Sequence, residues 1–171
     1  MNNIDFNALN NISYGMYIVT TNDNEKHVGC VANVLEQITA DPIMVSICIN
    51  RDNYTNECIK NTKKVAINIL PQNIQPIIIG TFGYRSSKDI DKFENIDYSI
   101  VDNVPIIGSS TGYLTGELVQ QIEIETHTLF IIKVKTAKML NESIPMTYDY
   151  YRNVIKGKSP KNAPTYQSNT L

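Results

Sequence analysis

The sequence contains only three cysteines, Cys30, Cys48 and Cys58, and no two of them form a CxxC pair. Structural zinc sites, dithiol redox sites and cysteine-ligated iron sites depend on such pairs, so we expect no metal site in this chain. Cys30 and Cys48 lie within apolar stretches typical of strands, where a cysteine packs as a small hydrophobic residue. The thiols are therefore expected to be buried.

Long apolar runs and an excess of positive charge are also missing. No stretch reaches the roughly 18 apolar residues that a membrane-spanning helix needs, and residues 1–11 have neither a basic start nor an apolar core. The formal net charge is -2, with 42% hydrophobic and 19% charged residues. This composition is typical of a soluble globular protein and predicts a cytoplasmic location, with neither a membrane nor nucleic acid as a partner.

Common nucleotide-binding and catalytic motifs are absent as well. The chain has no GxGxxG after its first strand and no GxxxxGK[ST], which excludes Rossmann and P-loop phosphate binding. His127 opens an apolar strand, and spacing alone assembles no catalytic triad or metal-ligand set around it. His127 is then either a packed or surface histidine or a hydrogen-bond donor beside a redox ring.

β-Branched and aromatic stretches make up much of what is present. They predict a β-hairpin over 14–33 and strands at 43–49, 64–70, 97–101, 113–126 and 127–140, the last two as antiparallel neighbours. A helix is expected to begin after an N-cap at Asn53. A second short helix includes Pro76 and ends near Gly80, and a third precedes the tail; residues 35–42 and 103–110 are expected to be a loop and a turn.

Many strands with only short helices between them favour a mainly β fold over a doubly wound sheet. The long consecutive antiparallel segments favour a small closed β-barrel. At 171 residues, and without a linker composition, the chain is expected to form one domain over 1–171, with 157–171 as a C-terminal tail.

Hydrogen-bonding side chains are crowded into the turn between strand and helix, at residues 50–55. A helix N-terminus leaves about four backbone N–H groups unpaired and carries partial positive charge, so it attracts anions. Arg51 adds a cation, whereas Asp52 would repel a phosphate and should point away. The turn is either a phosphate contact or an ordinary N-cap in a polar loop.

Two further polar clusters could also bind a ligand or could be ordinary polar loops. In residues 81–93, Gly83 lets a backbone approach a ligand, while Arg85, Ser86 and Ser87 are grouped donors. A solvated loop is the alternative for this stretch. Residues 32–39 carry polar side chains suited to the edge of a flat heteroaromatic ring, although a polar loop commonly has the same residues.

Four stretches together resemble a known family: GCVANVLEQITADPIMVSICINRDNYTNECI, GTFGYRSSKDIDKF, THTLFIIKV and IPMTYDYYRNVIKGKSPKNAPTY. In this order, and over nearly the whole chain, they are similar to the flavin reductase-like proteins with an FMN-binding split barrel. The likeness is greatest to the flavoprotein domain of high-molecular-weight rubredoxins and flavoredoxins.

The resemblance implies a homodimeric split β-barrel that binds FMN without a covalent bond near the subunit interface. It implies His127 as the residue bordering the reactive face. By this resemblance, the flavin loop falls on Asn33, Val34, Leu35, Gln37 and Thr39, and the phosphate turn on Asn50, Arg51, Asn53, Tyr54 and Thr55. The second phosphate loop falls on Phe82, Gly83, Arg85, Ser86, Ser87 and Lys92.

The implied activity is that of a flavoprotein oxidoreductase. Electrons would pass from NADH, NADPH or a protein donor to an acceptor such as rubredoxin or free flavin. The alternatives are a non-catalytic protein that stores or senses FMN, and a related split barrel that acts on a vitamin B6 phosphate.

Four positions depart from the family pattern. Thr126 stands where relatives often carry an acidic residue and Ile132 where they carry glycine, while Glu36 stands where serine or threonine is common and Ser87 where glycine is common. The second pair is expected to affect how tightly FMN binds. The bulky Ile132 side chain is expected to fill space beside the flavin ring and so to oppose nicotinamide binding.

Overall fold

A computed structural model describes residues 4–24 and 26–167. Glu25 of the expected hairpin turn and residues 168–171 of the expected tail lie outside these ranges. No helix in the described ranges is long and apolar enough to cross a membrane. The elements run in the order α1 (Phe6–Leu9), β1 (Tyr17–Asp23), β2 (Lys26–Ala32), β3 (Leu35–Ala40), β4 (Ile43–Asn50), α2 (Tyr54–Thr62), β5 (Lys64–Ile69), α3 (Pro76–Tyr84), β6 (Tyr98–Val101), β7 (Val104–Ile107), β8 (Gly112–Ile124), β9 (His127–Met139) and α4 (Tyr148–Asn153).

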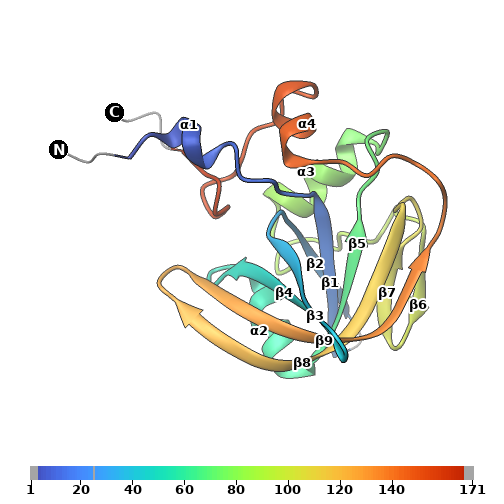
Figure 1. The fold of residues 1–171 in the computed structure, drawn as a ribbon. Helices are drawn as coiled ribbons and strands as arrows, with labels where there is room; N and C mark the ends of the chain where they lie inside the picture. The colour runs from blue at the N-terminus through green and yellow to red at the C-terminus, as the bar shows by residue number, and fades with distance from the viewer. Residues whose placement is uncertain (1–3, 25, 168–171) are drawn as a thin grey trace.

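Seven strands form one strongly curved sheet in the order β2-β1-β5-β8-β9-β4-β3, and β6 pairs with β7 in a separate two-stranded sheet (Figure 1). In the part of the chain that the structure describes, no ladder joins β2 to β3, so the barrel is open. The closed barrel expected from the strand pattern is therefore wrong, and the split barrel implied by the resemblance is confirmed.

Several expected elements are confirmed. β1 and β2 form the hairpin, with Tyr17 opposite Ala32, and β8 and β9 are antiparallel neighbours. Helix α2 begins after Asn53, whose side chain accepts a hydrogen bond from the Thr55 backbone. These elements are specified by local signals, namely alternation, turn residues and a capping side chain.

Other expectations about secondary structure are wrong. The expected loop at 35–42 contains edge strand β3, and the expected turn at 103–110 contains strand β7. Helix α3 continues past Gly80 to Tyr84, and Gly80 does not have the positive φ of a helix-ending glycine. The short helix α1 was not expected.

Two hydrophobic clusters lie on opposite faces of the sheet. Ile18 of β1 packs with the side chains of α3 and α4, whereas its neighbour Val19 packs inside the curved sheet with those of β4, β5 and β9. Successive residues of a strand point to opposite faces. Because both faces of β1 are buried, successive residues of this strand are apolar. The cavity described below lies where the two clusters meet.

An aromatic cluster anchors the segment that follows α3. Phe93 packs edge-on against Phe82 of α3, with ring centroids 5.2 Å apart, and against His27 and Tyr98 at 5.6 and 5.3 Å. Such edge contacts fix ring orientation as well as burying apolar area. The segment carrying Arg85 and Ser86 is thus held against β2.

Candidate functional site

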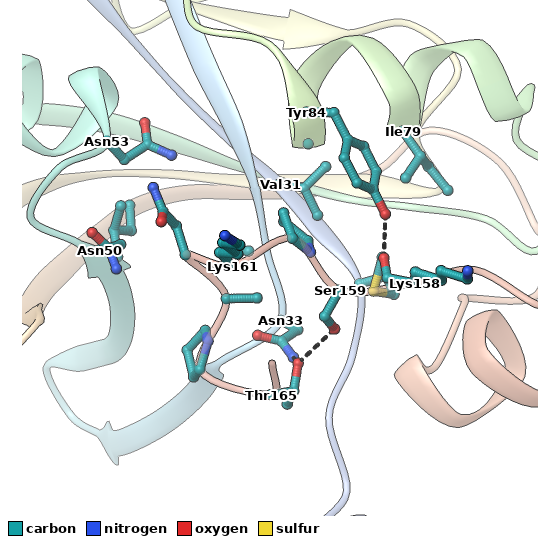
Figure 2. A pocket seen from close by; sticks show the side chains of 18 of the residues that line it. Val31, Asn33, Asn50, Asn53, Ile79, Tyr84, Lys158, Ser159, Lys161 and Thr165 are labelled. Carbon is teal, nitrogen blue, oxygen red and sulfur yellow. Dashed lines mark hydrogen bonds between the residues drawn. The ribbon is translucent and has the colours of Figure 1, made fainter. Parts of the chain in front are cut away.

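A cavity of about 380 Å³ opens between strands β2 and β4, helices α3 and α4, and the C-terminal stretch of the chain (Figure 2). This volume is within the roughly 300–1,000 Å³ typical of small-molecule sites. Residues from every one of these elements line it: Met16, Val31, Ala32, Asn33, Cys48, Ile49, Asn50, Asp52, Asn53, Tyr54, Ile79, Gly83, Tyr84, Arg85, Ser86, Tyr148, Tyr151 and residues 158–165.

Strand β4 presents one of its faces to the cavity. Cys48 and Asn50 are two residues apart and share that face, whereas Ile47 of the same strand points into the buried core. Ile49, at the end of the strand, also lines the cavity. Burial raises the pKa of the Cys48 thiol, so at neutral pH the thiol stays protonated and is a poor nucleophile. Cys48 is therefore a lining residue rather than a reactive one.

The polar turn after β4 serves both the backbone and the cavity. The Asn50 side chain accepts a hydrogen bond from the Asp52 N–H at 2.9 Å, and Asn53 caps α2 through the Thr55 N–H at 3.0 Å. Asn50, Asn53 and Tyr54 also line the cavity. The ordinary capping role is thus present, and the amide groups of the two asparagines still border the space where an anion would lie.

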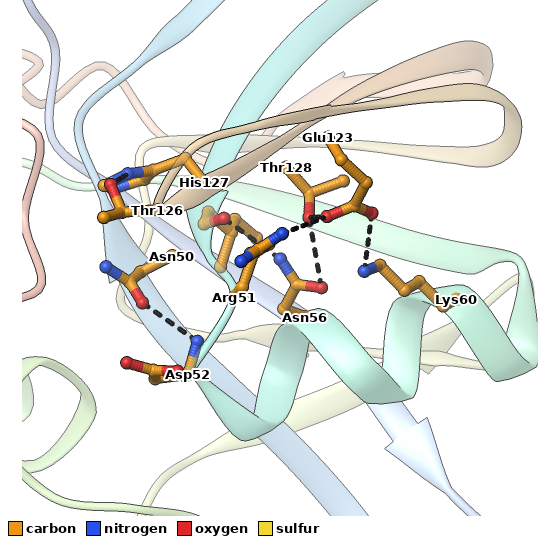
Figure 3. Close-up of polar contacts among 10 residues, drawn as sticks. Asn50, Arg51, Asp52, Asn56, Lys60, Glu123, Thr126, His127 and Thr128 are labelled. Carbon is orange, nitrogen blue, oxygen red and sulfur yellow. Dashed lines mark hydrogen bonds and ion pairs between the residues drawn. The ribbon is translucent and has the colours of Figure 1, made fainter.

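Arg51 and Thr55 belong to the same turn but lie outside the cavity lining. The Arg51 guanidinium is 3.8 Å from Glu123 of β8, and its backbone N–H donates to Thr126 (Figure 3). The Thr55 side chain is 1% exposed. The cation that the sequence singled out at this turn is therefore directed towards β8.

The second predicted phosphate loop divides into two groups. Gly83, Arg85 and Ser86 line the cavity. Phe82, Ser87 and Lys92 are buried behind it, exposed by 1, 1 and 3%. The structure therefore brings only the first group to the site.

The buried members hold the loop in place. Lys92 donates to the Gly29 carbonyl of β2 at 2.8 Å and to the Phe82 carbonyl of α3 at 3.2 Å. The Ser87 hydroxyl exchanges weaker hydrogen bonds with the Gly29 backbone at 3.3 and 3.4 Å. Lys92 and Ser87 therefore fix the backbone from which Arg85 and Ser86 reach the cavity.

Positive charge gathers at the cavity although the chain is acidic overall. Arg85, Lys158 and Lys161 line it, against the single carboxylate of Asp52. Arg85 has no ion-pair partner among the residues that the structure describes. Cations without ion-pair partners, beside the amide groups of Asn50 and Asn53, favour a ligand with a negatively charged end.

His127 is not among the residues that line the cavity, but it pairs across the strands with Asn50, which does line it. Figure 3 shows His127 beside Thr126. Its Nδ1 atom is 2.8 Å from the Thr126 hydroxyl, whereas its Nε2 atom is buried without a hydrogen bond in the described ranges. Burial lowers the pKa of the ring, and the nearby Asn162 backbone opposes that shift. Because the pKa is lowered, the ring is mainly neutral at pH 7, and it lies close to the backbone of Asn162, which lines the cavity.

Strand β3 carries most of the predicted flavin loop. Asn33, just before it, lines the cavity, but Val34, Leu35, Gln37 and Thr39 do not. Gln37 and Thr39 are exposed at this edge strand, where they bond to the nearby backbone. The structure of one chain therefore brings only Asn33 of this group to the site.

Ile132 does not line the cavity, and its expected effect on nicotinamide binding stays a prediction. Ile132 is 1% exposed and belongs to the inner cluster with Phe130. Its position on β9 places it on the face opposite to Leu129, which pairs with Cys48 of the cavity. Its size therefore takes no space from the site.

Sequence reasoning missed the apolar and aromatic part of the lining. Alternation along β4 would have placed Cys48 on the same face as Asn50. Tyr84, Tyr148 and Tyr151 gave no local signal, because their role depends on α3 and α4 meeting in space. The same holds for residues 158–165, which the sequence indicated only as a tail.

Comparisons with known proteins agree on one family. The flavin reductase like domain matches residues 9–157. The high molecular weight rubredoxin of Moorella thermoacetica is 37% identical over 165 residues, which are 95% of this chain and 72% of that protein. The ferric-chelate reductase (NAD(P)H) of Archaeoglobus fulgidus is 31% identical over 165 residues, which are 95% of this chain and 98% of that protein.

A solved structure gives the same fold. The NADH:FAD oxidoreductase SgcE6 of Streptomyces globisporus superposes with a TM-score of 0.75 at 20% identity, covering 82% of this chain and 84% of that one.

The buried Lys92 leads to a prediction about how the stability of the protein depends on pH. Burial lowers the pKa of Lys92 from 10.5 to about 8, so between these values the unfolded chain holds a proton that the folded chain has lost. Stability therefore rises with pH across this window. From pH 7 to pH 10 the free energy of unfolding of the wild type should increase by about 1–3 kcal/mol relative to Lys92→Met.

Urea unfolding of both proteins at each pH measures this difference. Lys138→Met, which removes an exposed lysine of β9, is the control for loss of one positive charge. A gap between wild type and Lys92→Met that stays constant from pH 7 to pH 10 would contradict the role given to burial.

Proposed function

The chain belongs to the flavin reductase-like family, and on that premise we propose that its cavity binds FMN and makes the protein a redox carrier. As a member of this family it is a flavin reductase-like oxidoreductase. The identity of the flavin, its electron donor and its acceptor are the proposed parts. The single observation that supports FMN most directly is the arrangement of apolar and cationic groups around the cavity.

The cavity fits an amphipathic ligand. Its inner side is made of apolar side chains, among them Met16, Val31 and Ile79, which suit a flat ring system. Arg85 and the turn at Asn50 and Asn53 lie on the polar side, where charge-assisted hydrogen bonds would hold a phosphate. This division matches the isoalloxazine ring and the phosphate tail of FMN.

The chemistry of electron transfer would be supplied by the bound flavin, which takes up electrons from a donor and releases them singly or in pairs. The side chains of this protein bind, orient and shield. Burial by Tyr148 and Tyr151 would keep water from one side of the ring. His127, neutral and with a free Nε2 atom, remains our candidate for a residue bordering the reactive face.

The names of two relatives suggest the donor and acceptor. A ferric-chelate reductase that uses NAD(P)H suggests a reduced nicotinamide as donor, and a high molecular weight rubredoxin suggests a rubredoxin as acceptor. No group of three or more metal-ligating side chains gathers in the described ranges. Free flavin is a second candidate acceptor, and a cytoplasmic location stays a prediction from the sequence.

We also propose a homodimer, because the face of the sheet that bears the cavity continues into an exposed apolar surface. Cys48 pairs with Leu129 of β9, and Leu129 pairs with Ile122 of β8, so all three side chains lie on one face. Ile122 and Ile124 are 43 and 48% exposed. A second copy packed on this surface would bury it and cover the open side of the cavity.

The first test is colour. Purified protein incubated with FMN should retain flavin absorbance after gel filtration, and anaerobic NADH or NADPH should bleach it. Retained colour that neither nicotinamide bleaches would favour a storage or sensing protein or a protein donor. A folded protein that stays colourless would reject the proposal.

The phosphate contact is tested with Arg85→Gln. Losing one charge-assisted contact, worth about 1.5–3 kcal/mol, should weaken FMN binding roughly tenfold to a hundredfold. Riboflavin, which has no phosphate, should bind with unchanged affinity.

Arg51→Gln is the matched comparison, because Arg51 faces Glu123 outside the cavity. This variant should change the FMN affinity far less. Equal losses for FMN and riboflavin in Arg85→Gln would argue against a phosphate at this place.

The dimer is tested with Ile122→Glu. The seven-stranded sheet and the cavity should remain intact in this variant. The added charge in an apolar interface should weaken the association of the two copies at least about tenfold. Light scattering coupled to gel filtration measures the mass as a function of concentration. Ile100→Glu replaces an equally exposed isoleucine, 50% exposed, on the separate sheet and should leave the mass unchanged. A monomeric wild type at high concentration would exclude the interface.

A further inference from the structure

One wall of the cavity comes from residues 158–165, which we call the strap. These eight consecutive residues line the cavity and follow α4 without forming a helix or strand. In Figure 2 the strap crosses the cavity between Asn33 on one side and Tyr84 on the other. A large part of the site therefore depends on a segment outside the sheet.

A chain of side-chain hydrogen bonds fastens the strap at its two ends. The Tyr148 hydroxyl of α4 is 2.6 Å from the Ser159 hydroxyl, which is 3.0 Å from the Thr165 hydroxyl. Thr165 in turn accepts a hydrogen bond from the Asn33 amide at 3.0 Å. Asn33 is 6% exposed and follows directly on β2, so the strap is tied to the sheet through one buried amide.

Other side-chain hydrogen bonds hold the strap and the residues just after it. The Gln167 amide, two residues beyond Thr165, donates to the Asn10 side chain at 2.9 Å. The hydroxyl groups of Tyr84 and Tyr151 donate to the Lys158 carbonyl. The backbone hydrogen bonds that the structure gives for N–H groups of residues 158–167 stay within the stretch, from Ala163 to Pro160 and from Tyr166 to Ala163. A strand would be held by a ladder of backbone bonds, whereas this segment is held by separate side chains that can be released together.

The strap borders the cavity but does not fill it. With the strap in place the cavity still measures about 380 Å³, a volume typical of a ligand site. A segment that inhibits by occupying its own site would leave no such space. The geometry is that of a lid closed over a binding site.

The strap also brings charge to the site. Lys158 and Lys161 are exposed and line the same cavity as Arg85. An anionic ligand would attract the two lysines, and their mutual repulsion with Arg85 would oppose closure when the ligand is absent. Ligand charge and strap closure should therefore favour each other.

We propose that the strap is a lid whose opening sets the rate at which flavin leaves the cavity. Tyr148, Ser159 and Thr165 are positioning residues that act through the strap. A closed strap makes the flavin a retained cofactor, and an open strap lets it exchange as a substrate. This inference rests on the proposed function for its ligand, but the strap itself can be tested without flavin.

The first experiment measures flavin release in the full chain. Thr165→Val keeps the shape of the side chain and removes two hydrogen bonds, and Tyr148→Phe removes one. FMN dissociation, followed by the recovery of flavin fluorescence after dilution, should be about tenfold faster in Thr165→Val and severalfold faster in Tyr148→Phe. The thermal unfolding midpoint of the flavin-free proteins should change little.

Tyr150→Phe is the matched control. Tyr150 lies on the same helix as Tyr148, and its hydroxyl makes no hydrogen bond in the described ranges. This variant should release FMN at the wild-type rate. Release from Thr165→Val that matches Tyr150→Phe, or that is slower, would overturn the lid.

The second experiment uses trypsin on flavin-free protein, because the strap contains the cleavable bonds after Lys158 and Lys161. Cleavage at these bonds, identified by mass spectrometry, should be faster in Thr165→Val than in the wild type and in Tyr150→Phe. Added FMN should slow cleavage of the wild type.

Together the two experiments distinguish a wrong ligand from a wrong lid. If the wild type binds no flavin but Thr165→Val is cleaved faster, the strap opens as inferred and the proposed ligand is wrong. If flavin binds and both the cleavage and the release rates are the same in all variants, the ligand stands and the lid is wrong.

Discussion

The hydrogen bonds of the Lys92 ammonium group are the constraint on which the site depends. By joining the Gly29 carbonyl of β2 to the Phe82 carbonyl of α3, they fix the distance between a strand and a helix that form two walls of the cavity. Burying this cation costs free energy, because no carboxylate in the described ranges pairs with it. The pKa of Lys92 is lowered for the same reason. Phe82 lies near the C-terminal end of α3, where the helix dipole favours a positive charge and offsets part of the cost. A positive charge in this position also belongs to the field that an anion in the cavity would meet.

The two-sided burial of the sheet explains where the cavity can form. The side chains of β1 supply both clusters, and residues of both clusters line the cavity. Cys48 of the cavity lining pairs with Leu129, which pairs with the exposed Ile122, so the apolar face of β8 and β9 continues from the cavity wall. The predicted flavin-loop residues on β3 do not line the cavity and lie on an edge strand of the sheet.

Local signals in the sequence predicted the fold better than they predicted the site. Alternation and turn chemistry were sufficient for the β1–β2 and β8–β9 hairpins, and Asn53 was recognisable as a cap. Strand β3 was not predicted, because an exposed edge strand needs no apolar alternation and is held by pairing with β4 rather than by burial.

Seven of the predicted site residues line the cavity: Asn33, Asn50, Asn53, Tyr54, Gly83, Arg85 and Ser86. Lys92 and Ser87 were not separable from Arg85 and Ser86 in the sequence, since the same residue types serve a ligand or a backbone carbonyl according to which side of the loop they occupy.

The tyrosines at the cavity connect the fold to the strap. Tyr148 and Tyr151 are buried in the cluster beneath α4, yet their hydroxyl groups reach Ser159 and the Lys158 carbonyl. A tyrosine can do both, because its ring is apolar and its tip is polar. The position of the strap is therefore coupled to the packing of α4 on the sheet, and α4 follows the isolated bridge between Gly15 and Thr147. Opening of the strap must therefore disturb the packing of α4 at one end and, at the other, break the hydrogen bonds from the Asn33 amide to Thr165 and from the Gln167 amide to Asn10.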